Sequence, residues 1–161
     1  MNTYTVTFFG HRQIEHPFEV EKRLDKLIRE LINNKEYVEF LVGRSGEFDQ
    51  MVSSTVRRVK KAVDDANSAL VLVLPYLTAE YTNNKASFEN YYDEVEIFDS
   101  RHFRSAFTER NRSMVDRADL IICYIEHNSG GAFSAIRYAE KKNKKILNVA
   151  SAGKEYNYAN I

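Results

Sequence analysis

Residues 69–74 read ALVLVL, six apolar residues with no polar break. A strand with one face in water alternates apolar and polar side chains. An uninterrupted apolar run is instead typical of a strand covered on both faces, as in a parallel sheet between helices. The run ends at Pro75-Tyr76, so its length suits a single strand. It predicts an α/β fold.

Three other strand-like segments each lead into a turn that contains glycine. The strand and turn pairs are 3–9 with 10–12, 37–42 with 43–46, and 120–125 with 130–132. If the strands are parallel, these turns lie along one edge of the sheet. Open α/β sheets bind ligands in the crevice at that edge. The sequence therefore predicts where a site lies before it indicates a ligand.

Apolar residues at helical spacing predict the helices between these strands. The predicted helices cover 17–33, 47–65, 104–118 and 131–143, and two further strands cover 94–98 and 145–149. We expect a single Rossmann-like three-layer domain over residues 1–150, with a mostly parallel sheet, helices on both faces and strand order 4-3-2-1-5-6. Residues 151–161 lack periodicity and are expected to form a C-terminal tail.

The segment 78–92 interrupts this alternation of strands and helices. It combines aromatic residues with Asn, Glu and Lys. We interpret it as an irregular segment or short helix. A flap over the crevice and a plain surface excursion both stay open.

Composition bounds the classes of function. The chain has 161 residues, and its 23 Lys and Arg balance 23 Asp and Glu. A zero net charge makes nucleic acid an unlikely partner, because such proteins carry a basic excess. No apolar stretch is long enough for a membrane span and no signal peptide is visible, so we expect a cytoplasmic protein without a membrane partner. The single cysteine, Cys123, and four scattered histidines give no metal site, and no cofactor is indicated.

The turn 43–46 leads directly into a helix that begins near Glu47. Free amides in the first turn of a helix and the positive end of its dipole favour an anion such as phosphate. Arg44 could add a bidentate contact. The turn is not a P-loop, because the GK[ST] ending is absent. Asp49 lies where the helix dipole favours a carboxylate, which gives it a structural interpretation as well.

The turn 129–132 repeats this arrangement, because a pair of glycines opens the next helix. Two helix N-termini beside one crevice suit a ligand with a phosphate and a second polar group. His11 and Arg12 add a titratable ring and a cation at the same edge, although His11 is also suited to capping the next segment. Arg110 lies on a helix whose start could face the crevice, or it is an ordinary solvated charge.

At these residues the chain resembles the SLOG superfamily, which joins the LOG nucleotide phosphoribohydrolases and DprA-type proteins. Within it, the chain most resembles the YpsA-like branch of uncharacterised proteins. The resemblance runs from residue 8 to about residue 149. It is carried by the motifs FGHR at 9–12, GRSGEFDQ at 43–50, PY at 75–76, RNRSMVDRAD at 110–119 and GGA at 130–132 through to YA at 138–139. It implies a Rossmann-like fold, a nucleotide-derived ligand at the sheet edge and a homodimer.

The chain departs from this superfamily at its catalytic residue. LOG-type hydrolases carry a glutamate in a GGxGTxxE pattern, and the matching positions here are Ala135 or Arg137, depending on register. Related deoxyribosyltransferases keep a glutamate matched by Ala135. Cleavage of an N-glycosidic bond needs a carboxylate to attack the sugar or stabilise its developing charge. Whether the chain is an enzyme is therefore open, with Glu47 and Asp49 as weak candidates for a displaced carboxylate.

The sequence favours binding or sensing of a nucleotide, an ADP-ribose-like molecule or a sugar nucleotide at the carboxyl edge of the sheet. The alternative is a nucleotide N-glycosidase that uses a displaced carboxylate. A DprA-like nucleic-acid module and a protein-interaction role are further possibilities. The predicted ligand-binding residues are Gly10, His11, Arg12, Gly43, Arg44, Ser45, Gly46, Glu47, Asp49, Pro75, Tyr76, Arg110, Asn111, Gly130, Gly131, Ala132 and Ser134.

Overall fold

A six-stranded sheet forms the centre of the molecule. The computed structural model describes residues 1–63, 66–100 and 102–150, and the predicted tail 151–161 lies outside them. The strands are β1 (Thr3–Gly10), β2 (Tyr37–Val42), β3 (Ser68–Leu74), β4 (Glu94–Ile97), β5 (Leu120–Tyr124) and β6 (Ile146–Asn148). Their order is β4-β3-β2-β1-β5-β6, which confirms the predicted order. Every neighbouring pair among these strands is parallel.

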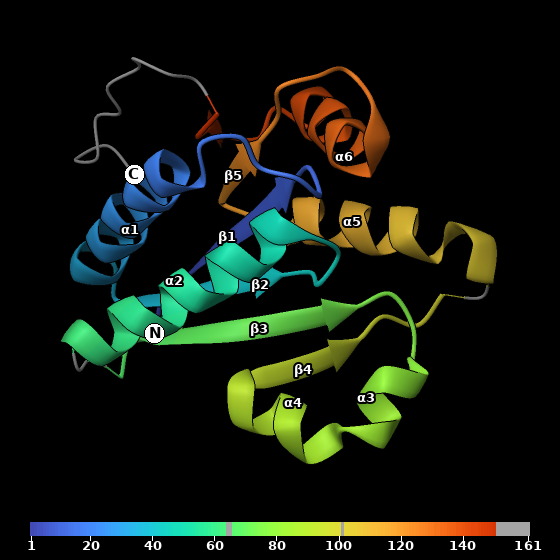
Figure 1. Cartoon of the computed structure of the whole chain (residues 1–161), viewed down its shortest axis with the longest axis horizontal. Helices are drawn as coiled ribbons and strands as arrows, with labels where there is room; N and C mark the ends of the chain where they lie inside the picture. The colour runs from blue at the N-terminus through green and yellow to red at the C-terminus, as the bar shows by residue number, and fades with distance from the viewer. Residues whose placement is uncertain (64–65, 101, 151–161) are drawn as a thin grey trace.

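Helices cover both faces of the sheet, so the predicted three layers are present (Figure 1). Helices α1 and α2 lie on one face and α5 and α6 on the other. The predicted start of α5 was wrong, because a 3₁₀ turn (Phe103–Ser105) occupies it. The helices are α1 (Pro17–Asn34), α2 (Glu47–Val63), α3 (Ala79–Asn83), α4 (Lys85–Tyr91), α5 (Ala106–Arg117) and α6 (Gly130–Lys141).

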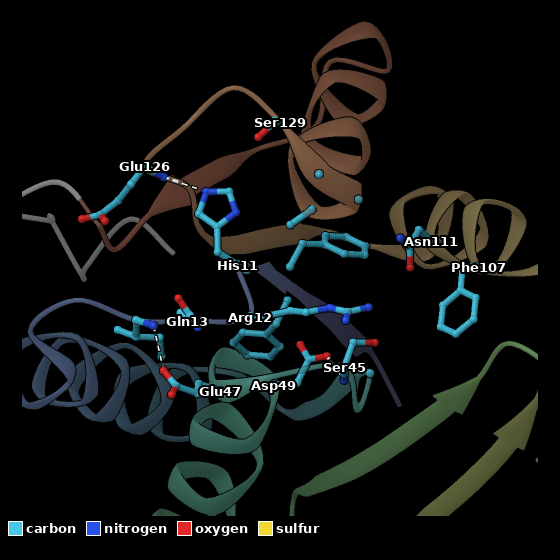
Figure 2. Close-up of a pocket in the computed structure, with 18 of the residues that line it drawn as sticks. His11, Arg12, Gln13, Ser45, Glu47, Asp49, Phe107, Asn111, Glu126 and Ser129 are labelled. Atoms are coloured by element: carbon cyan, nitrogen blue, oxygen red, sulfur yellow. Dashed lines mark hydrogen bonds between the residues drawn. The ribbon is translucent and has the colours of Figure 1, made fainter.

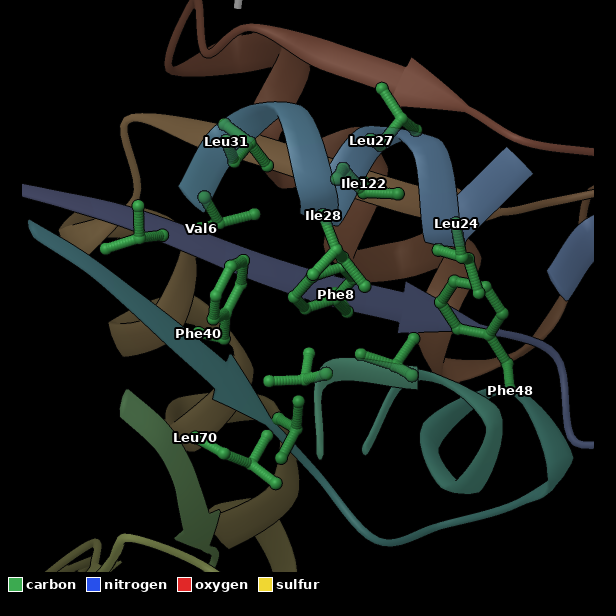
Figure 3. Close-up of a cluster of buried hydrophobic side chains, with 14 of the residues drawn as sticks. Val6, Phe8, Leu24, Leu27, Ile28, Leu31, Phe40, Phe48, Leu70 and Ile122 are labelled. Carbon is green, nitrogen blue, oxygen red and sulfur yellow. The ribbon is translucent and has the colours of Figure 1, made fainter. Parts of the chain in front are cut away.

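The central strands are buried from both sides, as their sequences predicted. Along β1, Val6 and Phe8 pack under α1 and α2 (Figure 3). Phe9 packs on the face covered by α5 and α6. All seven residues of β3 are buried, with Leu70 on the first face and Val71 on the second. This two-sided burial accounts for the unbroken apolar run.

The segment 78–92 forms the short helices α3 and α4 beside β3 and β4 (Figure 1). The Thr78 side chain accepts a hydrogen bond from the Tyr81 amide and so caps α3. Tyr81, Phe88 and Tyr92 are buried in the same core cluster as α1 and α2. The segment thus forms short helices, which confirms that part of the interpretation, and its buried aromatic rings hold it against the domain. No helix within the described residues is long and apolar enough to cross a bilayer.

Candidate functional site

A cavity of about 940 Å³ opens at the carboxyl edge of the sheet, where β1, β2 and β5 end (Figure 2). The three predicted glycine turns and the start of α5 supply most of its wall. Five of the predicted ligand-binding residues do not line it: Arg44, Gly46, Pro75, Tyr76 and Ser134. The other predicted residues do: Gly10, His11, Arg12, Gly43, Ser45, Glu47, Asp49, Arg110, Asn111, Gly130, Gly131 and Ala132.

The turn after β1 supplies the exposed cation of the cavity. The Arg12 side chain is exposed and extends toward the middle of the cavity, above Ser45 and Asp49 (Figure 2). The Arg12 carbonyl accepts a hydrogen bond from the Glu47 amide at 2.9 Å. This contact needs a glycine at position 46, because a Cβ there would lie 2.6 Å from the Arg12 Cα. The first two turns are therefore held together backbone to backbone.

The start of α2 is largely closed by the protein's own groups. The Ser45 amide donates to the Asp49 carboxylate at 2.8 Å, and the Glu47 amide is taken by Arg12 as described above. The Glu47 carboxylate accepts a further bond from the Ile14 amide at 2.8 Å. With two of its amides taken and two carboxylates beside it, the start of α2 is less suited to an anion than its sequence predicted.

Arg110 is a buried charge in the wall of the cavity, with only 5% of its surface exposed. Its guanidinium donates to the Val73 carbonyl at 3.1 Å and twice to the Asn111 side chain, at 3.1 and 2.9 Å. Burial lowers the pKa of Arg110, and the nearby Asp49 opposes that shift. Burial also raises the pKa of Asp49, against the Ser45 amide and the Arg110 charge. Arg110 is therefore an anchor of the wall rather than a solvated helix charge.

The start of α6 is open, unlike that of α2. Gly130 has a φ of 93°, and neither Gly130 nor Gly131 would bring an added Cβ within 4 Å of another group. Ser129 occupies the N-cap position, but it makes no capping hydrogen bond. Its hydroxyl instead pairs with Nδ1 of His127 at 2.9 Å. The first residues of α6, Gly130 to Ala132, thus line the cavity, and the Ser129 side chain does not cap their amides.

His11 fixes the loop that leads to α6. Its Nε2 accepts hydrogen bonds from the amides of Glu126 (3.0 Å) and His127 (3.3 Å), so this nitrogen carries no proton. The rings of His11 and His127 stack with centroids 3.6 Å apart. Burial, followed by the neighbouring His127, lowers the pKa of His11, while Glu126 opposes this. His11 caps the loop after β5, rather than the segment that follows it in the chain.

Arg44 and Tyr76 are directed away from the cavity. Arg44 forms an ion pair with Glu80 and lies 4.6 Å from the ring centre of Phe88. The predicted contact between Arg44 and a ligand phosphate is therefore not available in this arrangement. Tyr76 packs against Phe103, with ring centres 4.7 Å apart, and against Phe107. Only Phe107 of these rings lines the cavity.

The positions that match the superfamily's catalytic glutamate carry no acid. Ala135 is buried and Arg137 is exposed beside the ring of Phe133. Of the two candidate carboxylates, that of Glu47 accepts from the Ile14 amide and that of Asp49 from the Ser45 amide. No cluster of three possible metal ligands occurs in the part of the chain that the structure describes.

Sequence reasoning missed several residues of the cavity wall. Phe107 precedes Arg110 by three residues on one helix, and that spacing was the available signal. Gln13 follows the first glycine turn directly. The residues that line the cavity and were not predicted are Phe8, Phe9, Gln13, Ile14, Glu15, Phe107, Met114, Glu126, His127 and Ser129.

The fold is similar to that of DNA processing protein A. The protein from Helicobacter pylori, described as having a unique single-stranded DNA binding mode, matches with a TM-score of 0.64 and 18% identity, over 98% of this chain and 70% of its own. DprA from Streptococcus pneumoniae matches with a TM-score of 0.64 and 12% identity, over 89% of this chain and 49% of its own. No family profile and no curated protein sequence matches.

These matches confirm the predicted Rossmann-like fold. They also correct one expectation. We predicted that nucleic acid is an unlikely partner because the net charge is zero. That prediction is wrong, because the fold of this chain is shared with a protein described as binding single-stranded DNA. A net charge summed over the chain does not report the charge along one edge.

Proposed function

We propose that the cavity binds a nucleotide-derived ligand, with a phosphate of the ligand at the N-terminus of α6. The observation that carries this proposal is the open first turn of α6. Its glycines leave the backbone uncovered, and the Ser129 hydroxyl is engaged by His127 instead of the helix. Uncapped amides at the positive end of a helix dipole are a site for an anion.

The cations around the cavity favour the same ligand. Arg12 is exposed within the cavity and can approach a phosphate, whereas Arg110 is buried and charged in the cavity wall. The Phe107 ring at the mouth is about half exposed, at 47%, and offers a surface for a base. A phosphate near α6 and a base near Phe107 would both remain within the same cavity.

Binding fits the cavity better than cleavage does. The superfamily's glutamate is replaced by Ala135 or Arg137, and the Glu47 and Asp49 carboxylates accept hydrogen bonds from backbone amides. Cleavage of an N-glycosidic bond would need one of these two carboxylates to act on the sugar in place of that glutamate. Release of free base, abolished by Glu47→Gln or Asp49→Asn, would instead establish the glycosidase alternative.

Calorimetric titration with ADP and with adenosine tests the proposal. We expect ADP to bind at least about tenfold more tightly than adenosine, because a charge-assisted phosphate contact contributes about 1.5 kcal/mol or more. Arg12→Ala should remove about tenfold of the ADP affinity. Arg112→Ala is the matched control, because this arginine is exposed on α5 and packs on Tyr138 outside the cavity. Equal affinity for ADP and adenosine, or no binding of either, would contradict the proposal.

Single-stranded nucleic acid is a second candidate ligand. It is favoured by the fold shared with a single-stranded DNA-binding protein and by exposed rings beside the cavity. Phe103 is 71% exposed and packs on Tyr76, which also contacts Phe107. Single-stranded nucleic acids bind proteins by stacking successive bases on such rings.

Fluorescence anisotropy with a labelled oligothymidylate tests this candidate. Phe103→Ala should weaken binding by about fivefold or more, since stacking of one base contributes about 1–3 kcal/mol. Phe18→Ala is the control, because Phe18 is similarly exposed but lies on α1. Binding that is absent in the wild type, or unaffected by Phe103→Ala, would remove nucleic acid as a candidate at this surface.

We further propose that the chain belongs to the YpsA-like branch and acts as a homodimer in the cytoplasm. The motifs at 9–12, 43–50 and 130–132 support the first part, and the superfamily resemblance supports the second. Light scattering after size-exclusion chromatography measures the mass directly. A monomer across the micromolar range would contradict the dimer.

A further inference from the structure

A second cavity of about 750 Å³ lies between the start of α1, α2 and α4. Its walls are largely apolar and aromatic. Pro17 and Met51 line it from α1 and α2, and Phe88, Tyr91 and Tyr92 line it from α4 and the residue after it. The guanidinium of Arg57 lies 4.2 Å from the ring centre of Tyr91 and fixes that ring.

The second cavity adjoins the first, because two residues line both. These residues are Ile14 and Glu47, which are joined by the 2.8 Å hydrogen bond from the Ile14 amide to the Glu47 carboxylate. The two cavities therefore meet beside Glu47.

The charged groups of the second cavity already have partners. Arg44 pairs with Glu80, and Glu21 pairs with Arg58 at 3.2 Å. The cavity therefore does not need a charged ligand. An uncharged planar group with polar edges would fit between the aromatic rings that line the cavity. A nucleobase has this chemistry.

We propose that the second cavity receives the second nucleoside of a ligand in which two nucleosides are joined through phosphates. This rests on the proposed function, because the phosphates of that ligand lie at α6 in the first cavity. A ribose then passes Glu47, where a carboxylate is a suitable acceptor for a ribose hydroxyl. The phosphates themselves stay away from the negative charge of Glu47. The ligand class is therefore a dinucleotide rather than a mononucleotide.

Calorimetric titration with ADP and with diadenosine diphosphate tests this inference, because the two share a diphosphate and differ by one nucleoside. The wild type should bind the dinucleotide at least about tenfold more tightly than ADP, through the second, linked contact. Ser87→Trp fills the second cavity from an exposed position of α4. It should abolish this preference and leave the affinity for ADP unchanged. Asn90→Trp, exposed on the same helix but outside the cavity, should behave as the wild type.

The outcomes separate the two proposals. Equal affinity for both ligands, or a preference that survives Ser87→Trp, overturns the second subsite and leaves the first intact. No binding of either ligand to the wild type overturns the proposed function and the subsite together. A 5′-phosphorylated deoxyadenosine dinucleotide is the third ligand of this titration. If it shows the same preference over its mononucleotide and the same sensitivity to Ser87→Trp, the two-nucleoside chemistry stands and comes from a DNA strand.

Discussion

The N-termini of α2 and α6 both follow glycine turns, but they differ in whether the protein's own groups occupy their backbone amides. Each follows a buried parallel strand and lies at a pair of glycines, and from these sequences we predicted a phosphate site at both. At α2 the Glu47 amide is bonded to the Arg12 carbonyl and the Ser45 amide to Asp49. At α6 the Ser129 hydroxyl bonds to His127, and a Cβ added to Gly130 or Gly131 would have no neighbour within 4 Å.

The difference shows that a glycine turn can serve packing or binding. Gly46 lets the Arg12 backbone come close. Gly43 leaves room for the Asp49 carboxylate and the Arg110 guanidinium, which would lie 3.0 and 3.3 Å from a Cβ at that position. These glycines are needed for contacts within the protein. Gly131 has no such neighbour, so its lack of a side chain keeps the backbone open instead.

Alanine at each glycine tests this comparison most directly. Gly46→Ala should lower the free energy of unfolding by about 1–3 kcal/mol, because its Cβ would overlap the Arg12 backbone. Gly131→Ala should have no cost and could stabilise α6 by up to about 1 kcal/mol, since alanine favours the helix. Urea unfolding followed by circular dichroism measures both variants. Equal losses of stability would mean that the two turns are packed alike.

A carboxylate at the open N-terminus should separate stability from binding. Ser129→Asp places a negative charge at the positive end of α6, which should stabilise the ligand-free protein by about 0.5–1 kcal/mol. The same charge should repel a phosphate and weaken ADP binding by about tenfold, or about 1.4 kcal/mol. Thermal unfolding and calorimetry give the two values.

Ser129→Asn is the matched control for that variant, because it offers a capping oxygen without a charge. It should change ADP affinity much less than Ser129→Asp does. If Ser129→Asp leaves ADP affinity unaltered, the phosphate does not lie at α6.

The fold could be predicted from the sequence because the apolar patterns that decide it are local. The apolar run at 69–74 correctly predicted a strand buried on both faces. The glycine turns correctly indicated the strand ends that meet at the cavity. Whether the backbone amides of each turn are open to a ligand could not be predicted in this way. It depends on partners distant in the chain, such as His11 with the amides of Glu126 and His127, 115 and 116 residues away. The prediction that Arg44 contacts the ligand was wrong for the same reason, because Arg44 forms an ion pair with Glu80 on α3.

The residues at the N-cap positions of α3 and α6 should differ by a smaller amount of unfolding free energy. Thr78 accepts from the Tyr81 amide, so Thr78→Ala should cost about 1 kcal/mol of unfolding free energy. Ser129 occupies the corresponding position of α6 without capping it, and Ser129→Ala should cost less than about 0.5 kcal/mol. Chemical denaturation of the two variants measures the difference. A loss at Ser129→Ala as large as at Thr78→Ala would show that Ser129 caps α6 in solution.

The smallest expected effect is a dependence of stability on pH at His11. Its Nε2 accepts two amide hydrogen bonds, and burial lowers its pKa in the folded protein. The unfolded chain therefore takes up a proton more readily than the folded one. The contribution of His11 is fully present above about pH 6.5, the ordinary value for histidine, and decreases as the pH falls through it. Urea unfolding at a series of pH values should show this decrease.

His11→Gln provides the comparison, because glutamine keeps an acceptor oxygen but does not titrate in this range. It should flatten the pH dependence, whereas His102→Gln, at an exposed position, should not. Hydrogen exchange tests whether this pH dependence arises at His11. Protonation of Nε2 would place a donor against the amides of Glu126 and His127, so these amides should lose protection at low pH while those of the α2 turn keep theirs. A pH slope that is the same in His11→Gln and wild type would show that the loop before α6 is held by other contacts.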